Sequence, residues 1–451
     1  MASTYLSRTI SSEGNRTTLT ISCWFKRSKV GADQHLFSSR DNGVNSGSVD
    51  EVKLTSADIL RVEGYSGSGY NYRKHTNRKL RDTNAWYHVV VAYDTSNSTA
   101  DDRIKIYING ERETSFSTST NPSSSFSTYW FDTTDPFIIG TDVRTLTGAS
   151  NFDGLMAHVH VVDGTAYAAS TFGETDSSSG IWKPKTSPSV TYGTNGFFLK
   201  FQDSSSLGDD SSGNTNDFTL TGSGKQILDT PSNVFATMNP LSGGSLTTFE
   251  NGNLKTTNSS NSDNGNFRST ILQSSGKWYV EVKCGAVGAT NNPRYGIIHE
   301  EGAAVPSNGS TYSIGTYNPS VAYQNNGAVN VSGSNTLTLN TYAADDIIGL
   351  ALDLDNGAFY VSKNGTFENS GDPTSGSSKT GAIYTFTPGD NYAFACTEYN
   401  NSISYWNFGN GYFGTTAISS AENDDAGYGK FEYDVPAGYY ALCTKNINNY
   451  G

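Results

Sequence analysis

Apolar and polar side chains alternate along short runs throughout this chain. In the run "TLTISCWFKRS", Leu19, Ile21, Cys23 and Phe25 fall on one face, and the residues between them fall on the other. A period of two residues is typical of a β-strand that buries one face. We therefore predict a series of antiparallel strands in the first half of the chain. Comparable runs are "AWYHVVVAYD" (85–94), "DDRIKIYINGE" (101–111), "PFIIG" (136–140), "NFDGLMAHVHVVDG" (151–164) and "NGFFLKF" (195–201).

The second half repeats this organisation. Asn-Gly and Asp-Gly pairs and Ser-rich segments separate the runs, and few windows hold the Ala, Leu, Glu and Lys mixture of long helices. The predicted fold class is all-β, with two antiparallel, jelly-roll-like β-sandwiches in tandem. The runs are "GKWYVEVKC" (276–284), "RYGIIHE" (294–300), "DDIIGLALDLDNGAFYVSKNG" (345–365), "NYAFAC" (391–396) and "SISYWNFG" (402–409).

The length of 451 residues is more than one ordinary domain core requires. Residues 206–240 are polar and rich in Gly and Ser, so we predict a linker there. It would separate a sandwich over 1–205 from a second sandwich over 241–451. Within the linker, "NDFTLTG" (216–222) is a candidate edge strand.

Charge and composition exclude several classes of protein. The net charge of −13 argues against a general nucleic-acid binder. No apolar run approaches the ~18 residues of a membrane span, and the first residues lack the apolar core of a secretory signal. The four cysteines are far apart and form no CxxC pair, so we predict buried thiols in a reducing compartment and no zinc site, disulfide framework or cofactor. They are Cys23, Cys284, Cys396 and Cys443.

The order of these strand-like runs resembles that of two known families, one in each half of the chain. "LTISCWFKRS", "AWYHVVVAYD", "IKIYINGE", "FIIG" and "FDGLMAHVHVVDG" together resemble the laminin-G-like branch of the concanavalin A-like fold. "GKWYVEVKC", "YGII", "VAYQNNG", "DDIIGLALDLDNGAFYVSKNG", "YWNFG" and "PAGYYAL" resemble a SPRY domain. The tandem, with "FGETDSSSGIWKPK" (172–185) after the first sandwich, is similar to virion-associated proteins of marine tailed bacteriophages, including cyanophages.

The resemblance implies a non-enzymatic virion protein made in the host cytoplasm. It would be a tail fibre or short fibre that binds a host-surface glycan such as lipopolysaccharide. The implied partners are other virion proteins and further copies of the chain, trimeric as in many fibres, with no nucleic acid and no membrane insertion. The laminin-G-like strands begin by residue 18, which favours as the alternative a capsid decoration or connector protein that binds only virion subunits. A surface-polysaccharide depolymerase is the third hypothesis.

No catalytic residue is predicted. Hydrolases with the concanavalin A-like fold carry their carboxylates on one strand as E-x-D-x-E. The nearest match, "GETDSSSG", has Glu174 and Asp176 but Ser178 at the third position. The depolymerase hypothesis would therefore need Glu174 and Asp176 to meet in a cleft.

No metal site is predicted either. An EF-hand loop has Gly at its sixth position and Glu at its twelfth, whereas counting from Asp353 gives Gly357 fifth and Asn364 twelfth. Apolar alternation on both sides of Gly357 predicts a β-hairpin instead. His158 and His160 share a strand face without an evident third ligand, which favours packed histidines. Calcium in the acidic loops at 209–210 and 422–427 is left open.

The segment "GYSGSGYNYRKHTNRKLR" (64–81) is the main candidate for binding, and we predict a Gly/Ser-rich loop there. Tyrosines can stack on sugar rings, while Arg and Lys can pair with phosphate or carboxylate. An anionic glycan, an acidic neighbouring subunit, and a solvated hairpin that protects an edge strand remain alternatives. In the second half, the SPRY resemblance points to loops at one end of the sandwich. The candidate ligand-binding residues are Tyr65, Tyr70, Tyr72, Arg73, Lys74, Arg78 and Lys79 in the first half and Tyr312, Tyr317 and Tyr323 in the second.

Overall fold

The fold is all-β, as predicted, and divides into two compact units, Met1–Gln226 and Ile227–Gly451. Each sheet draws its described strands from one unit only. The computed structural model describes residues 4–40, 47–133, 135–146, 150–177, 179–242, 245–261, 263–288, 292–300, 308–309, 313–316 and 319–451.

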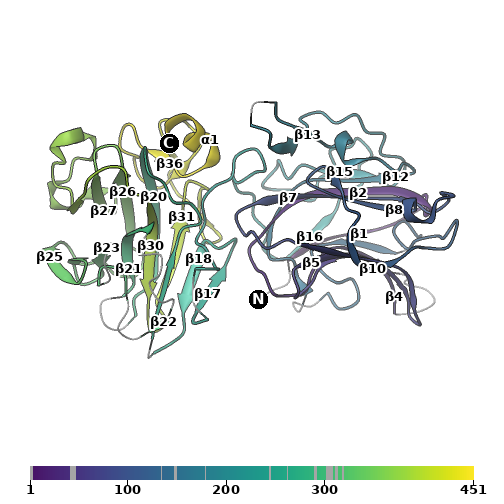
Figure 1. Cartoon of the computed structure of the whole chain (residues 1–451), viewed down its shortest axis with the longest axis horizontal. Coiled ribbons are helices and arrows are strands. Elements are labelled where there is room, and N and C mark those ends of the chain that lie inside the picture. The colour runs from purple at the N-terminus through teal and green to yellow at the C-terminus, as the bar shows by residue number, and fades with distance from the viewer. Residues whose placement is uncertain are drawn as a thin grey trace. The chain divides into compact units, whose positions relative to one another are not determined.

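The first unit is a sandwich of an eight-stranded and a six-stranded antiparallel sheet, which form two layers (Figure 1). The first sheet has the order β10-β6-β5-β4-β3-β11-β1-β16 and the second β15-β12-β2-β7-β8-β9. The first sheet consists of β1 (Tyr5–Thr9), β3 (Gln34–Arg40), β4 (Ser48–Leu54), β5 (Ile59–Ser66), β6 (Tyr70–Lys79), β10 (Phe116–Thr120), β11 (Pro136–Ile139) and β16 (Thr219–Thr221). The second consists of β2 (Thr18–Arg27), β7 (Trp86–Asp94), β8 (Ile104–Ile108), β9 (Glu111–Arg112), β12 (Gly154–Asp163) and β15 (Phe197–Leu199).

The core of this unit lies between the two sheets. The predicted inward face of β2 is confirmed, because Leu19, Ile21 and Phe25 are completely or almost completely buried. The outer face of the six-stranded sheet is covered by the hairpin of β13 (Gly173–Thr175) and β14 (Trp182–Pro184). The Trp182 indole donates a hydrogen bond of 3.0 Å to His88 Nδ1 of β7.

The second unit is also a sandwich of two sheets, which are antiparallel except for the parallel pair of β20 and β36. Its larger sheet has the order β17-β18-β31-β20-β26-β27-β28, with β29 paired to β27 and β36 paired to β20. The other sheet has the order β22-β19-β30-β21-β23-β24-β25. The larger sheet consists of β17 (Thr247–Glu250), β18 (Lys255–Asn258), β20 (Lys277–Ala286), β26 (Ile347–Asp353), β27 (Ala358–Lys363), β28 (Thr366–Phe367), β29 (Tyr384–Thr385), β31 (Ile403–Asn407) and β36 (Tyr440–Ala441). The smaller consists of β19 (Asn264–Arg268), β21 (Arg294–His299), β22 (Asn308–Gly309), β23 (Ser320–Gln324), β24 (Ala328–Val331), β25 (Ser334–Thr338) and β30 (Tyr392–Glu398).

Short elements complete the chain. They are the pairs β32 (Tyr412–Phe413) with β33 (Thr416–Ala417) and β34 (Glu422–Asn423) with β35 (Lys430–Phe431), the helix α1 (Thr444–Tyr450), and the 3-10 helices η1 (Ala100–Asp102), η3 (Ala169–Thr171), η5 (Glu368–Ser370) and η6 (Pro373–Ser378). Within the described ranges, no helix combines the length and the apolar character that a membrane span requires.

The hairpin predicted in place of an EF-hand is confirmed as β26 and β27. Leu350 and Leu352 point into the core, as the alternation requires. Asp353 is buried, pairs with Lys277 at 3.1 Å and accepts a hydrogen bond from the Asn356 backbone. Its carboxylate therefore belongs to the turn.

The polar segment 206–240 is divided between the two units. The candidate edge strand in it is confirmed, since β16 pairs with β1, and Phe218 is buried in the first core. Beyond the boundary, Phe235 and Met238 are buried in the second unit. The Asp210 carboxylate accepts hydrogen bonds from three backbone N–H groups, so the Ser, Asn and Asp residues of this segment form tight turns.

Candidate functional site

The segment 64–81 is a β-hairpin, so the prediction of a loop was wrong. It consists of the end of β5, a turn in which the Ser66 N–H donates to the Gly69 carbonyl at 2.9 Å, and the whole of β6. The Gly/Ser-rich part is only the turn. Of the basic residues that follow, Arg73 lies opposite Glu63 of β5 and Arg78 pairs with Glu113.

The hairpin helps to build three rows of side chains across the outer face of the eight-stranded sheet. The rows follow from the register of β3, β4, β5 and β6, in which residues opposite one another point to the same face. We call them the tyrosine row (Arg40, Val49, Tyr65, Tyr70), the carboxylate row (Ser38, Glu51, Glu63, Arg73) and the base row (His35, Lys53, Arg61, His75).

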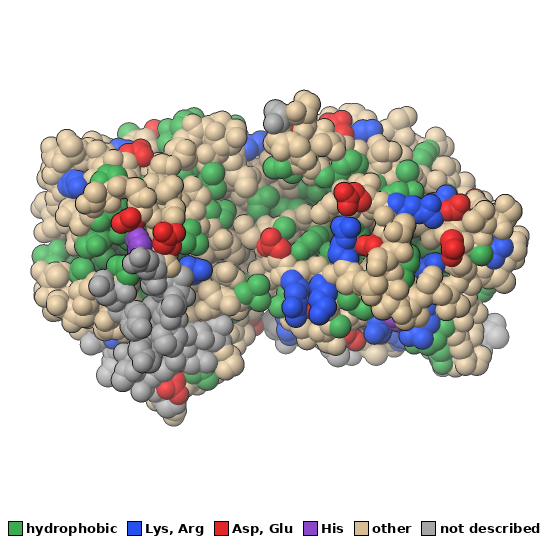
Figure 2. Space-filling model, in the orientation of Figure 1, with side chains coloured by type: hydrophobic (Ala, Val, Ile, Leu, Met, Phe, Trp, Pro, Cys, Tyr) green, Lys and Arg blue, Asp and Glu red, His purple; other side chains and the backbone are tan. Residues whose placement is uncertain are grey.

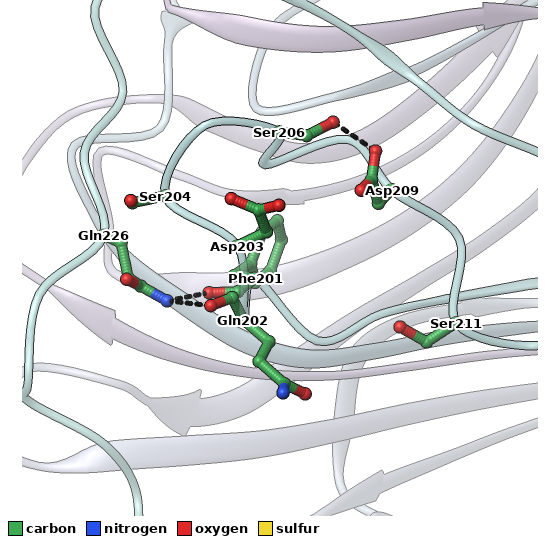
Figure 3. Close-up of a pocket in the computed structure, with 8 residues that line it drawn as sticks. All are labelled: Phe201, Gln202, Asp203, Ser204, Ser206, Asp209, Ser211 and Gln226. Atoms are coloured by element: carbon green, nitrogen blue, oxygen red, sulfur yellow. Dashed lines mark hydrogen bonds between the residues drawn. The ribbon is translucent and has the colours of Figure 1, made fainter.

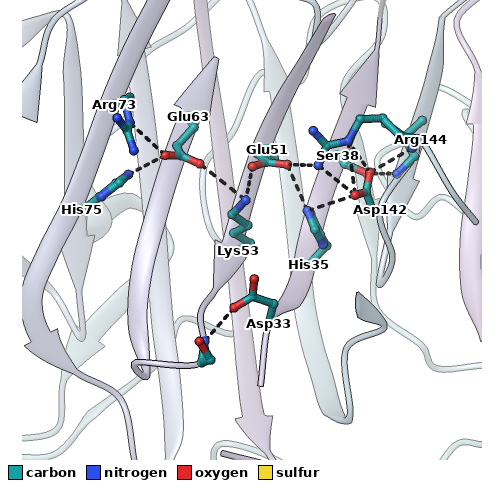
Figure 4. A network of polar contacts seen from close by, with 12 residues as sticks. Asp33, His35, Ser38, Glu51, Lys53, Glu63, Arg73, His75, Asp142 and Arg144 are labelled. Carbon is teal, nitrogen blue, oxygen red and sulfur yellow. Dashed lines mark hydrogen bonds and ion pairs between the residues drawn. The ribbon is translucent and has the colours of Figure 1, made fainter. Parts of the chain in front are cut away.

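The two carboxylates of the second row share one lysine (Figure 4). Lys53 pairs with both Glu51 and Glu63. Glu51 is also bound by His35 Nε2 at 3.0 Å and by Arg144 Nη2 at 3.0 Å. Glu63 is bound in the same manner by His75 Nε2 and by Arg73 Nε, the latter at 3.2 Å. The row is thus a nearly symmetrical ion-pair network.

The bases of this network lower the pKa values of two acids, Glu51 and Asp142. Burial alone would raise the pKa of Glu51, but the hydrogen bond with His35 and the charge of Lys53 hold the pKa well below its usual range. Burial also opposes ionisation of Asp142, yet the hydrogen bonds from Arg144 lower the pKa of that carboxyl. A glycosidase acid needs a raised pKa so that it can deliver a proton. The arrangement of Glu51 and Glu63 around one lysine therefore does not suit acid/base catalysis.

Tyr70 is the exposed aromatic of the hairpin. Its side chain is 47% exposed, and the Arg73 guanidinium carbon lies 3.9 Å from its ring centroid. The Tyr65 ring is 5.0 Å away and its hydroxyl donates to the Gly67 carbonyl. Tyr65 packs against the buried side chains of Val49 and its neighbours. The tyrosine row therefore presents two aromatic rings. Val49 and its neighbours support the Tyr65 ring, and Arg73 packs against the Tyr70 ring.

The other predicted site residues have different environments. Tyr72 is completely buried and its hydroxyl donates to Asp50 at 2.8 Å, so its assignment to a ligand surface was wrong. Lys74 is buried and donates to Ser119, and Arg78 pairs with Glu113 at 3.1 Å. Lys79 is exposed at the end of β6.

In the second unit, Tyr323 is also completely buried, and its hydroxyl donates to the Asn340 carbonyl. A buried ring cannot stack on a ligand, which corrects that assignment as well. Tyr312 and Tyr317 lie outside the described residues.

Sequence reasoning missed the acids and the second arginine of the site. Glu51 and Glu63 lie at outward positions of β4 and β5, where alternation alone gives no reason to connect them. Arg144 and Asp142 come from the segment after β11, and Arg144 is 93 positions from its partner Glu51. No local pattern links residues at such a separation.

The remaining candidates have structural partners. Lys183 of β14 lies 2.7 Å from Asp176 and 3.9 Å from Glu174. Both acids therefore form ion pairs with this lysine. His160 Nδ1 lies 2.7 Å from the Tyr192 hydroxyl, and its ring is stacked 3.8 Å from that of Phe198. These contacts agree with the packing interpretation of the histidines.

The acidic loops use their carboxylates to hold turns. A shallow polar depression of about 470 Å³ lies beside Asp203 and Asp209, where Ser206 donates to Asp209 (Figure 3). In the second unit, Asp424 is buried and accepts from the N–H groups of Tyr428, Gly429 and Ala441. Over the described part of the chain, no group of three or more His, Cys, Asp or Glu side chains is placed to hold a metal ion. The four cysteines are free and buried, as predicted.

With this geometry established, the first sandwich can be compared with known proteins. Residues 3–170 match the family model described as the concanavalin A-like lectin/glucanases superfamily. This part of the chain is laminin-G-like. The match spans the strands from β1 to β12 and so includes all three rows. No curated protein sequence matches the chain.

Several solved structures are similar to part of the chain. The SPRY domain of human HERC1 is 16% identical, with 38% of this chain and 96% of that domain covered and a TM-score of 0.31. The TRIM65 PSpry domain is 14% identical, with 38% and 91% covered and a TM-score of 0.28. A SAP-like pentraxin from Limulus polyphemus is 14% identical, with 37% and 78% covered and a TM-score of 0.27.

Proposed function

We propose that this protein is a non-enzymatic binding protein that recognises a surface glycan through the tyrosine row. The observation that carries the proposal is Tyr70, an exposed ring on a rigid sheet with the Arg73 guanidinium against it. Aromatic rings supply flat apolar faces for sugar rings, and guanidinium groups donate hydrogen bonds to sugar oxygens. A ring that is already held in position loses little conformational entropy on binding.

The proposed setting is the particle of a tailed bacteriophage, where the chain would act as a tail fibre or short fibre. The tandem resemblance supports this setting. One flat aromatic site gives weak binding, and several copies on one particle would multiply it into stable attachment. We therefore propose a homo-oligomer with other virion proteins as partners and lipopolysaccharide as the kind of host glycan.

The non-enzymatic part of the proposal has its own support. The carboxylates of the described outer face are paired with bases, and Glu174 and Asp176 share Lys183. On the face of the first unit that Figure 2 shows, Lys and Arg side chains are interspersed with Asp and Glu side chains. Such pairing suits recognition through fixed hydrogen-bond donors better than proton transfer.

The test is binding of the fluorescently labelled full chain to candidate host cells, with and without purified lipopolysaccharide as competitor. We expect saturable, competed binding, and about tenfold weaker binding for Tyr70→Ala. Tyr450→Ala is the matched control, because Tyr450 is a comparably exposed tyrosine, 42%, on α1 of the second unit. If even multivalent beads coated with the chain fail to bind, the decoration or connector alternative replaces this proposal.

A further inference from the structure

Arg61 belongs to the base row and forms no ion pair or hydrogen bond with any residue that the structure describes. We infer that Arg61 is an anion-binding residue, which holds an oxyanion such as a phosphate, sulfate or carboxylate group through the fork of its guanidinium. The inference goes beyond the proposed function, because it requires neither a sugar nor a contact with Tyr70.

The residues on both sides of Arg61 are bases. Lys53 of β4 and His75 of β6 are its direct cross-strand neighbours, and the Cβ atoms of such neighbours lie about 5 Å apart. Like charges that are directly opposite one another destabilise a sheet. Burial lowers the pKa of His75, and the charge of Arg61 also lowers it. The sheet by itself therefore does not favour an arginine at this position.

The acids of the same face are paired with other bases (Figure 4). Glu63 is paired with two bases on Oε1 and with Lys53 on Oε2. Glu51 likewise has a base on each of its oxygens. Both side chains are nearly buried, with Glu51 4% and Glu63 1% exposed, and neither pairs with Arg61. The charge of Arg61 is therefore left without a counter-ion among the described residues.

The hydrogen-bond donors of Arg61 indicate the kind of counter-ion. Its Nε is buried and has no hydrogen-bond partner, so the sheet supplies no acceptor to this guanidinium. The side chain as a whole is only half-buried, and Nη1 and Nη2 are not among the buried unpartnered atoms. Two N–H groups in one plane match two oxygens of an oxyanion, which binds both and neutralises the charge. Chloride neutralises the charge but offers only one acceptor atom.

The test uses inorganic and small organic anions, so that binding is measured without a glycan. The melting temperature of the full chain is recorded in phosphate, sulfate, acetate or chloride at matched ionic strength. We expect at least one of the three oxyanions to raise the melting temperature saturably above its value in chloride. The half-saturating concentration of that oxyanion should be about tenfold higher for Arg61→Gln.

The variants also separate anion binding from a structural contribution of Arg61. Removal of the like charge opposite Lys53 should leave the melting temperature of Arg61→Gln in chloride unchanged or raise it, which also verifies that the variant is folded. Arg61→Lys keeps the charge but lacks the planar fork, so it should weaken oxyanion binding as well. Arg112→Gln is the matched control, because Arg112 is 41% exposed and paired with Asp102 at 2.6 Å, and it should keep the response.

Two results would overturn the inference. One is an equal melting temperature of the unsubstituted chain in all four anions. The other is an oxyanion response that both Arg61 variants retain. Neither result changes the binding of host cells that we expect through Tyr70, so the inference and the proposed function fail separately.

Discussion

The Arg73 guanidinium carbon lies 3.9 Å from the centroid of the Tyr70 ring, while Arg73 Nε donates to the buried carboxylate of Glu63 at 3.2 Å. A buried acid thus fixes an exposed aromatic ring through an arginine that touches both. The surface that we propose for binding is therefore organised from inside the sheet.

The first prediction concerns Glu63, which positions Arg73 without reaching the ligand. Glu63→Gln should weaken glycan binding about threefold to tenfold, because the charge-assisted hydrogen bond that orients Arg73 becomes weaker. Titration calorimetry measures the affinity. Glu111→Gln, at an exposed acid that pairs with Arg78 at 3.5 Å, is the control and should change nothing.

The second prediction tests the correction at Tyr72. Tyr72→Phe leaves the buried Asp50 carboxyl without one hydrogen bond and should lower the free energy of unfolding by ~1–3 kcal/mol. Glycan binding should remain unchanged, since Tyr72 is inside the sandwich. Tyr70→Ala should give the opposite pattern, with weakened glycan binding and unchanged stability in urea unfolding. A Tyr72→Phe chain that is fully stable but binds glycan poorly would contradict our placement of this residue.

The third prediction concerns pH. Burial raises the pKa of Glu398 to about 8, and burial also raises the pKa values of Glu281 and Asp50 to about 7. An acid with a raised folded-state pKa binds its proton more tightly when folded, so its contribution to stability is complete below the unfolded value. That contribution is lost as the pH rises through the folded value. The buried histidines His88 and His160, whose pKa values burial lowers, act in the opposite direction below about pH 7. The net fall in unfolding free energy is therefore expected between about pH 7 and about pH 9.

The variant Glu398→Gln removes the contribution of Glu398 to the pH dependence of stability. The amide has the shape of the protonated acid and can accept the hydrogen bond from Thr256, but it never ionises. We expect urea unfolding of this variant to show a flatter pH dependence and greater stability than the unsubstituted chain near pH 9. If the two proteins lose stability in parallel, Glu398 is not a source of the effect.

The fourth prediction concerns calcium in the acidic loop of the second unit. Asp424 accepts from three backbone N–H groups and from Asn446 Nδ2 at 2.7 Å, so its oxygens are engaged within the protein. Addition of calcium or of a chelator should leave the melting temperature unchanged. Asp424→Asn should lower the free energy of unfolding by ~1–3 kcal/mol, because an amide NH2 group replaces one acceptor oxygen and cannot accept from the buried N–H groups. Stabilisation by calcium would restore the metal hypothesis.

Alternation of side chains predicted long strands such as β2, β7, β20 and β26, because burial of one face leaves a direct trace in the order of residues. It did not predict the strands β3 to β6, which build the candidate site. It could not place Tyr70 and Tyr72, which are two residues apart and would share a face on a regular strand. A register shift between β5 and β6 next to Gly64 and Tyr65 inserts an additional residue, so that Tyr70 points outward and Tyr72 inward. Such a bulge depends on the partner strand, and the pattern within β6 does not reveal it.

The ion pairs of the site could not be predicted from the sequence either. The bases of 73–81 suggested a cationic loop, but their acids lie on β5 (Glu63), just before β5 (Asp58) and after β9 (Glu113). Hairpin neighbours such as Glu63 and Arg73 follow once the turn is known. Arg144 and Glu51 meet only because the segment after β11 lies over the sheet, and this is a property of the tertiary fold.

The boundary after Gln226 has a consequence for how such a protein can change over time. Since each sheet takes its described strands from one side of this boundary, a recombination event there would exchange one complete sandwich and leave the other intact. The face that we propose for recognition belongs entirely to the first sandwich, so it could be replaced while the second sandwich is inherited unchanged. A lineage could thus acquire a new specificity in a single genetic step.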